Sequence, residues 1–303
     1  MPPSADKYLE AGELLEQIRG DIQSGKHGAK ATEVATAALD KLLTGDLSLL
    51  EKRVGTSKEA LSALNDEQGW ELVSKKKEMR MFQRWREGSD MPELQVKIEA
   101  VLGPDPPVKT GDTLIVWREA QLYGKWFPMI KSGEKIKEFS HCELVLQLVA
   151  DLNFMHCDLL LHGWAVDNLR DGFFLMCVRP ARQKELPDVP LPPHPSQTHK
   201  ASLFPPTRAI AMIDVLVEPL SDDSVRFAFQ LSQKIPPWLP RWAVQMILHQ
   251  GMANIFTAMN KTAAGMVSDP NSLHAKLART PEYQPTASWL RGKFDKFLAQ
   301  QKI

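Results

Sequence analysis

The sequence has few of the features that mark disulfide-rich, metal-binding or nucleic-acid-binding proteins. Its 303 residues include three cysteines, Cys142, Cys157 and Cys177. An odd number of cysteines at wide spacing in apolar surroundings predicts buried, reduced thiols, and excludes a disulfide framework or a zinc site. The 37 basic and 37 acidic residues cancel. Since no net charge attracts nucleic acid from a distance, we expect no nucleic-acid partner.

Long apolar runs and the commoner signatures of enzymes are also missing. No stretch approaches the ~20 consecutive apolar residues of a membrane-spanning helix, and the first residues lack the basic start of a secretory signal. We therefore expect a soluble protein of the cytoplasm. A glycine-rich phosphate loop, a His-Glu-x-x-His pair and a Gly-x-Ser-x-Gly turn are absent from the sequence. We accordingly expect no metal or other cofactor and no enzymatic activity.

The first part of the chain has the composition of helices. Residues 5–63 combine high helix propensity with leucines at helical spacing, interrupted by a turn-like stretch at residues 24–28. This pattern predicts a helical extension over residues 1–66, folded as a hairpin that packs against the main domain. A segment that docks a partner protein is the alternative, and no residue in it decides between the two.

From Trp70 onward, apolar and polar residues alternate as in antiparallel strands with one sheltered face. In residues 92–102, for example, Leu94, Val96 and Ile98 alternate with polar side chains. Further predicted strands cover residues 71–86, 134–139, 141–152, 158–166, 173–179, 208–218 and 224–231, and a helix covers residues 113–123.

A proline-rich loop and a long helix complete the pattern. Seven prolines among residues 186–206 exclude a regular strand or helix, so we expect an irregular surface loop there. Residues 238–266 form the longest helical pattern of the chain, with Pro240 tolerated in its first turn. Residues 268–303 are predicted to be a tail with a short amphipathic helix.

This order of elements predicts an α+β domain with internal space. A twisted antiparallel sheet of about seven strands, followed by one long amphipathic helix, must bury one sheet face against the apolar stripe of the helix. Small inward-facing residues leave room for an apolar ligand between the two. The candidates are Ala100, Ala150, Gly163, Ala165, Ala209, Ala211 and Ala228.

Six short motifs occur in a fixed order along the chain. They are the two strands of a first hairpin (residues 69–73 and 79–84, counted as two motifs), a Leu-Tyr-x-x-Trp-x-Pro element (122–128), an aspartate-led strand (158–163), a penultimate strand (211–219) and a last strand that runs into Ile-Pro (225–238). In this order and spacing they resemble the START lipid-transfer domains of the helix-grip superfamily, over residues 69–264. The chain departs from the family at Cys157, where a basic residue usually precedes the aspartate.

The resemblance implies a helix-grip fold, in which a curved antiparallel sheet surrounds a long C-terminal helix. It implies a lipid-binding domain over residues 67–267, between the helical extension and the tail. The same resemblance implies an internal tunnel for a single hydrophobic molecule, a sterol, phospholipid or similar lipid. The protein would carry this ligand between membranes or sense it, acting as a monomer that touches membranes transiently.

The resemblance gives the inward-facing positions a role, because they would line the tunnel. On the strands these are Leu144, Leu146, Leu148, Ala150, His162, Trp164, Ala211, Ile213, Val215, Phe227 and Phe229. On the long helix they are Trp242, Met246, His249, Met252, Ala253 and Phe256. Phe154 and Met155, in a loop between central strands, are expected to touch the membrane, unless both pack inward.

Two other functions remain open at this stage. A helix-grip enzyme, such as a cyclase or hydrolase acting on an apolar substrate, could use His162 or Asp158 as a proton carrier. A scaffold without a cavity could be recognised by protein partners through its N-terminal helices. Asp214 and Glu218 alternate with apolar residues of their strand and are predicted to face outward.

Overall fold

The computed structural model describes residues 8–24, 29–44, 48–87, 90–152, 155–200 and 205–302. The strands are β1 (Glu71–Lys76), β2 (Met79–Arg86), β3 (Glu93–Leu102), β4 (Ile130–Ser140), β5 (Glu143–Leu152), β6 (Met155–Asn168), β7 (Phe173–Pro180), β8 (Thr207–Arg208), β9 (Ala211–Ser221) and β10 (Ser224–Lys234). The α-helices are α1 (Tyr8–Gln23), α2 (Ala29–Thr44), α3 (Ser48–Asn65), α4 (Thr110–Arg118), α5 (Tyr123–Trp126), α6 (Pro195–Thr198), α7 (Arg241–Ser268), α8 (Leu273–Leu277) and α9 (Gln284–Gln301).

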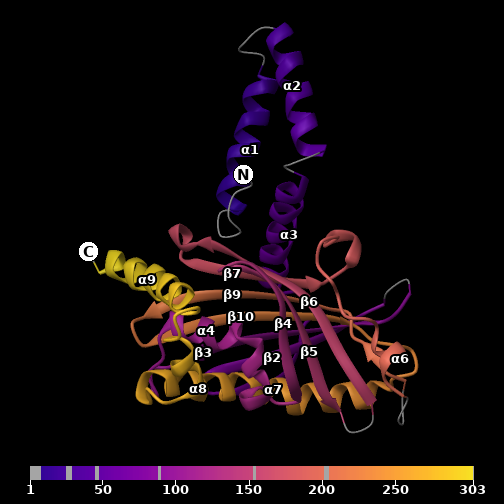
Figure 1. Cartoon of the computed structure of the whole chain (residues 1–303), viewed down its shortest axis with the longest axis vertical. Helices are drawn as coiled ribbons and strands as arrows, with labels where there is room; N and C mark the ends of the chain where they lie inside the picture. Colours follow the sequence, from indigo (N-terminus) through magenta and orange to yellow (C-terminus); the bar gives the residue numbers. More distant parts are fainter. Residues whose placement is uncertain are drawn as a thin grey trace.

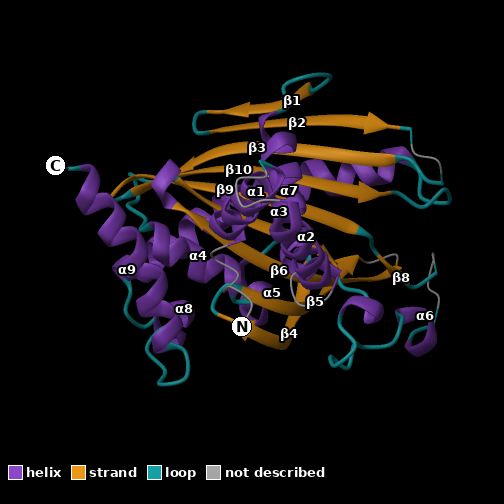
Figure 2. Ribbon diagram, turned by 90° about the horizontal axis from the view of Figure 1, so that it is seen from above, coloured by secondary structure: helices purple, strands orange, loops and turns teal. Residues whose placement is uncertain are grey.

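The strands form one curved sheet in the order β1-β2-β3-β10-β9-β7-β6-β5-β4, and β8 pairs with β6 (Figures 1 and 2). Every neighbouring pair along this path is antiparallel. The predicted α+β helix-grip architecture is confirmed. The sheet has ten strands, more than the seven or so that we expected. The eight predicted strand ranges become ten because residues 71–86 form a hairpin of two strands and the range 208–218 is divided between β8 and β9.

The concave face of the sheet packs against the long helix α7 and the shorter helix α4. Leu94, Val96 and Ile98, which alternate with polar residues in β3, are all buried in this core. From α7, Ile255 and Met259 enter the same core. The sheet therefore packs around its C-terminal helix as predicted. The burial of these apolar side chains stabilises the contact between helix and sheet.

The opposite face of the sheet carries the N-terminal helices. The predicted helical extension is confirmed, but it contains three helices instead of a two-helix hairpin. Figures 1 and 2 show α1 and α2 projecting away from the middle of the sheet, while α3 lies against it. Val54 and Leu64 of α3 pack with Trp164, Val166 and Leu175 of β6 and β7.

A buried ion pair accompanies this apolar contact between α3 and the sheet. The Arg53 guanidinium of α3 lies 3.7 Å from the centroid of the Trp164 ring. Glu143 Oε1 lies 2.9 Å from Arg53 Nη2 and 2.8 Å from His162 Nε2. Removing either partner of this ion pair destabilises the fold, because the charge of the other partner would remain buried without a counter-charge.

In the residues that the structure describes, the proline-rich segment lies against the same outer face, where Leu186 and Val189 pack on Leu160 of β6. It contains the four-residue helix α6 and is otherwise irregular over its described residues, as predicted. Arg208 anchors it, since Nη1 and Nη2 donate to the carbonyls of Pro192 and Pro193. Arg208 also donates through Nε and Nη2 to the two carboxylate oxygens of Asp158, at 2.9 and 2.7 Å. Asp158 therefore has an arginine partner, although Cys157 replaces the basic residue before it.

Other sequence predictions can be compared with the structure. All three cysteines are free, and burial raises the pKa of Cys157 and Cys177 to about 12. Asp214 and Glu218 face outward as predicted, paired with Arg179 and Arg226. In the ranges that the structure describes, no helix is both long and apolar enough to cross a membrane.

Replacing Arg53 with methionine should weaken the docking of α3 far more than replacing its neighbour Lys52. Both residues pair with a glutamate, but the Arg53 side chain is 6% exposed and the Lys52 side chain is 59% exposed. Removing one partner of a buried pair costs about 3 kcal/mol, whereas an exposed pair contributes at most about 1 kcal/mol. Urea unfolding of the Arg53→Met and Lys52→Met variants measures both losses. Equal losses would mean that the buried site does not stabilise the docked extension.

Candidate functional site

A cavity of about 210 Å³ lies between the concave face of the sheet and the helices α4 and α7. Strands β5, β6 and β7 form its largest wall. Most of its lining is apolar, and the apolar lining residues are Leu114, Trp117, Phe127, Met129, Ile130, Cys142, Leu144, Leu146, Leu148, Leu159, Leu161, Gly163, Trp164, Ala165, Phe174, Met176, Val178, Ile213, Phe229, Leu231, Met252, Ile255 and Leu290.

The cavity exists because one half of the concave face is filled and the other half is not. Under β10, Phe227 and Phe229 make edge-to-face contacts with Phe256 of α7, with ring centroids 6.2 and 6.0 Å apart. On β6, by contrast, the inward positions include Gly163, which has no side chain, and Ala165, which has only a methyl group. Neither residue fills the space between the strand and the helices. The predicted effect of small inward residues is seen at these two positions.

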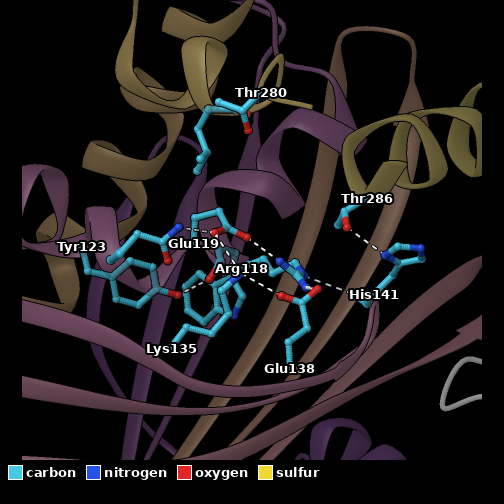
Figure 3. A network of polar contacts seen from close by, with 11 residues as sticks. Arg118, Glu119, Tyr123, Lys135, Glu138, His141, Thr280 and Thr286 are labelled. Atoms are coloured by element: carbon cyan, nitrogen blue, oxygen red, sulfur yellow. Dashed lines mark hydrogen bonds and ion pairs between the residues drawn. The ribbon is translucent and has the colours of Figure 1, made fainter. Parts of the chain in front are cut away.

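A polar network lies at one end of the cavity, where α4 ends beside the hairpin of β4 and β5 (Figure 3). The Arg118 guanidinium lies 2.5 Å from a carboxylate oxygen of Glu119 and 2.5 Å from one of Glu138. Its Nε donates to the carbonyl of His141 at 3.1 Å. Lys135 lies 2.8 Å from Glu138 and 3.7 Å from Glu119. The two cations and two carboxylates of this network therefore balance.

Arg118, Tyr123 and His141 bring this network to the cavity wall. Burial, together with the nearby Glu119 charge, raises the pKa of the Tyr123 phenol well above its usual value, so Tyr123 stays protonated, and it donates to the carbonyl of Trp117. Burial alone would raise the pKa of Glu138, but the Lys135 hydrogen bond and the Arg118 charge outweigh it and lower that pKa. Glu138 is therefore ionised at neutral pH, where it pairs with Arg118 and Lys135.

This arrangement can hold an apolar molecule, and the polar groups at its end pair with one another. Apolar walls remove the ligand's surface from water, which supplies the free energy of binding. His141 marks the rim, because its side chain is exposed while the residue also lines the cavity. No cluster of three or more metal-ligating side chains occurs among the residues that the structure describes.

Seven of the predicted lining residues border the cavity. They are Leu144, Leu146, Leu148, Trp164, Ile213, Phe229 and Met252. The three leucines of β5 point inward, as their alternation indicated. Trp164 borders the cavity, but its ring lies beneath the Arg53 guanidinium on the α3 side of the sheet.

Other predicted lining residues lie elsewhere, and these positions correct the sequence-based assignment. Ala211, Val215, Phe227 and Phe256 are buried in the packed core beneath α7, and Ala150 is not among the described residues that line the cavity. Trp242 is 67% exposed, because it lies on the solvent side of the first turn of α7. The side chains of Met155, Met246, His249 and Ala253, and the whole of Phe154, fall outside the described residues.

His162 and Asp158 lie on the outer face of β6, away from the cavity. His162 is held by Glu143 and Arg53, and Asp158 by Arg208 and Gln147. Both are even-numbered residues of β6, whereas the inward positions are the odd-numbered Leu159 to Ala165. The assignment of His162 to the tunnel was therefore wrong. A shift of one residue along a strand moves a side chain to the opposite face, and His162 is one residue away from the inward-facing Gly163.

Several lining residues were missed by the sequence reasoning. Leu159 and Leu161 of β6 and Met176 and Val178 of β7 follow the same alternation, so the correct strand phase would have identified them. Leu290 comes from α9 at the far end of the chain. No local pattern in the sequence places that helix against the cavity.

Comparison with known proteins adds evidence on the fold. No family model matches the sequence, and no curated protein sequence matches it either. The structure of human StAR-related lipid transfer protein 5 matches with a TM-score of 0.55 at 14% identity, covering 71% of this chain and 95% of that chain. Human STARD10 matches with a TM-score of 0.54 at 13% identity, covering 74% of this chain and 87% of that chain.

Identities this low show a shared fold alone. Both matches have TM-scores above 0.5 and cover more than 70% of this chain. The protein therefore has the helix-grip fold of the StAR-related lipid transfer domains, with additional helices at both ends.

Proposed function

We propose that this protein binds one hydrophobic molecule, a lipid or part of one, in the cavity and carries or senses it at membranes. The observation that carries the proposal is the apolar cavity, which is left open where Gly163 and Ala165 of β6 face the helices. Each methylene of a ligand removed from water contributes about 0.8 kcal/mol, so burying part of an alkyl chain supplies several kcal/mol toward retention.

The size of the cavity limits what it holds without rearrangement. At about 210 Å³ it exceeds the ~150 Å³ of a cavity that accepts benzene and falls below the ~300 Å³ of a small drug-sized site. A whole sterol or phospholipid therefore requires a wall to move outward. Helix α7 meets the cavity-lining Met129 at Gly251, where a Cβ would clash with the methionine side chain. Because that side chain is flexible, this contact can change when the wall adjusts.

Filling the cavity should abolish retention of the ligand. A Cβ on Gly163 meets only Val178, at an ordinary 3.6 Å, so a Gly163→Leu variant projects its side chain into the cavity. Native mass spectrometry of the purified protein, followed by organic extraction, should detect a bound apolar molecule in the wild type and none in the variant. Gly265→Leu is the matched control, because a Cβ at that position of α7 would meet no side chain and no other described part of the chain within 4 Å beyond its own helix turns and chain neighbours. This variant should retain the ligand.

Two results would contradict the proposal. One is a wild-type protein that carries no apolar molecule and takes up neither sterols nor phospholipids from vesicles, which would favour a scaffold. The other is equal retention by the Gly163→Leu and Gly265→Leu variants, which would place the ligand outside this cavity.

An enzymatic function through His162 or Asp158 is less well supported by the geometry. Both side chains lie on the outer face of β6 and are engaged by Arg53, Glu143 and Arg208. A ligand in the cavity would be separated from them by the strand itself. Binding without turnover is therefore the function that we propose.

We also propose that the membrane contacts the end of the molecule where α7 begins and β6 starts. Backbone hydrogen bonds from Lys234 to Ile210 and from Ala209 to Asp158 bring the end of β10 and the start of β6 together. Exposed apolar side chains gather there: Ile210, Met212, Trp238 and Trp242. Trp242 thus becomes a membrane contact in this proposal, beside the predicted contacts Phe154 and Met155, because tryptophan favours the membrane interface.

A Trp242→Asp variant should bind vesicles of phosphatidylcholine and phosphatidylserine at least about tenfold more weakly. It loses the apolar contact of the indole ring with the lipid, and the anionic vesicle surface repels the new carboxylate. Leu273→Asp, on the exposed face of α8 with Leu273 52% exposed, adds the same charge elsewhere and should bind like the wild type. Co-sedimentation measures both affinities. Equal weakening by the two substitutions would mean that charge alone, and not this end of the molecule, governs binding.

A further inference from the structure

Helix α9 forms one end of the cavity, although it lies outside the part of the chain that resembles START domains, residues 69–264. Of the residues in α9, all of them in the described part of the chain, Leu290 alone lines the cavity. Leu290 is buried on the inner stripe of the helix with Ala287, Phe294 and Leu298. The tail thus contributes directly to the space available to a ligand.

Contacts along its length hold α9 against the domain. Thr286 Oγ1 lies 2.7 Å from His141 Nδ1 at the rim of the cavity, as Figure 3 shows. Arg291 Nε donates to the buried Asp112 carboxylate of α4 at 2.7 Å. One turn further, Phe294 packs edge-to-face on Phe174, with centroids 5.7 Å apart. Interactions of three kinds therefore hold the helix as a fixed wall.

Leu290 is placed by a close approach of two helices. A Cβ on Gly111 of α4 would lie 2.9 Å from the Arg291 Cα, so the backbones of α4 and α9 meet at this glycine. Leu290 directly precedes Arg291 in α9, and Leu114 of α4 lines the same end of the cavity. The position of Leu290 is therefore fixed by the backbone contact and cannot retreat without undocking α9.

We propose that Leu290 closes this end of the cavity and sets the length of the ligand that fits. The proposal rests on the proposed binding of an apolar molecule in this cavity. Arg118, Lys135, Glu119 and Glu138 balance their charges at the same end and pair with one another, so no unpaired charge faces the ligand there and its alkyl end can lie against Leu290. Straight-chain primary alcohols have such an alkyl end and form a homologous series.

The test measures the affinity of alcohols from hexanol to dodecanol by isothermal titration calorimetry. In the wild type, affinity should rise about fourfold with each added methylene until the chain reaches Leu290, and then fall. Leu290→Ala removes three side-chain carbons and should move the optimum to longer alcohols by about that number. Leu290→Phe should move it to shorter alcohols.

Leu298→Ala is the matched control, because it makes the same substitution at a buried position of the same helix that does not line the cavity. Its melting temperature should fall as that of Leu290→Ala does, while its preferred alcohol stays that of the wild type. Unchanged preference in both Leu290 variants would overturn this inference and leave the proposed function standing. If the wild type binds no alcohol of the series, the proposed function fails together with the inference.

Discussion

Strand β6 must bury both of its faces, and much of the architecture depends on this constraint. Its odd-numbered residues, such as Leu161 and Ala165, face the cavity, while its even-numbered residues, such as His162 and Trp164, face the opposite side. Neither face tolerates water, because both carry large apolar groups or a charge that needs a partner. The concave side is covered by α4 and α7, and the outer side by α3 and the proline-rich segment. The N-terminal helix α3 is therefore part of how this sheet is completed.

The cavity follows from the way that α7 is supported. On one half of the sheet, the aromatic rings of Phe227, Phe229 and Phe256 lie between α7 and the strands. The size of these rings sets the distance between the helix and the sheet. A helix is stiff, so it keeps this distance as it passes the other half, where Gly163 and Ala165 cannot span it. Space remains there without any strained element, and an apolar molecule can occupy it at the cost of small adjustments.

Sequence reasoning recovered the strands, the long helix and the inward leucines of β5, because period-two and period-3.6 patterns report directly on which face is buried. It failed at β6 for a physical reason. A strand that is apolar on both faces has no polar face to fix its phase, so both Gly163 and its neighbour His162 were predicted to face the ligand, although only Gly163 faces inward. Trp242 was misplaced because the first turn of α7 is apolar on its exposed side as well. The contact of Leu290 with the cavity depends on where a distant helix docks, and local patterns carry no such information.

The buried charges show why each extension docks in one place. Arg53 joins α3 to Glu143, Arg208 joins the proline-rich segment to Asp158, and Arg291 joins α9 to Asp112. Apolar faces alone permit a helix to slide or rotate, since burial is not directional. A buried carboxylate instead has one position in which its partner reaches it, and every other position leaves it unpaired. Such pairs add little net stability, but they penalise misplaced docking. The same helix that closes the cavity is thus held in register by an ion pair at the residue next to Leu290, so a cavity of defined length is maintained.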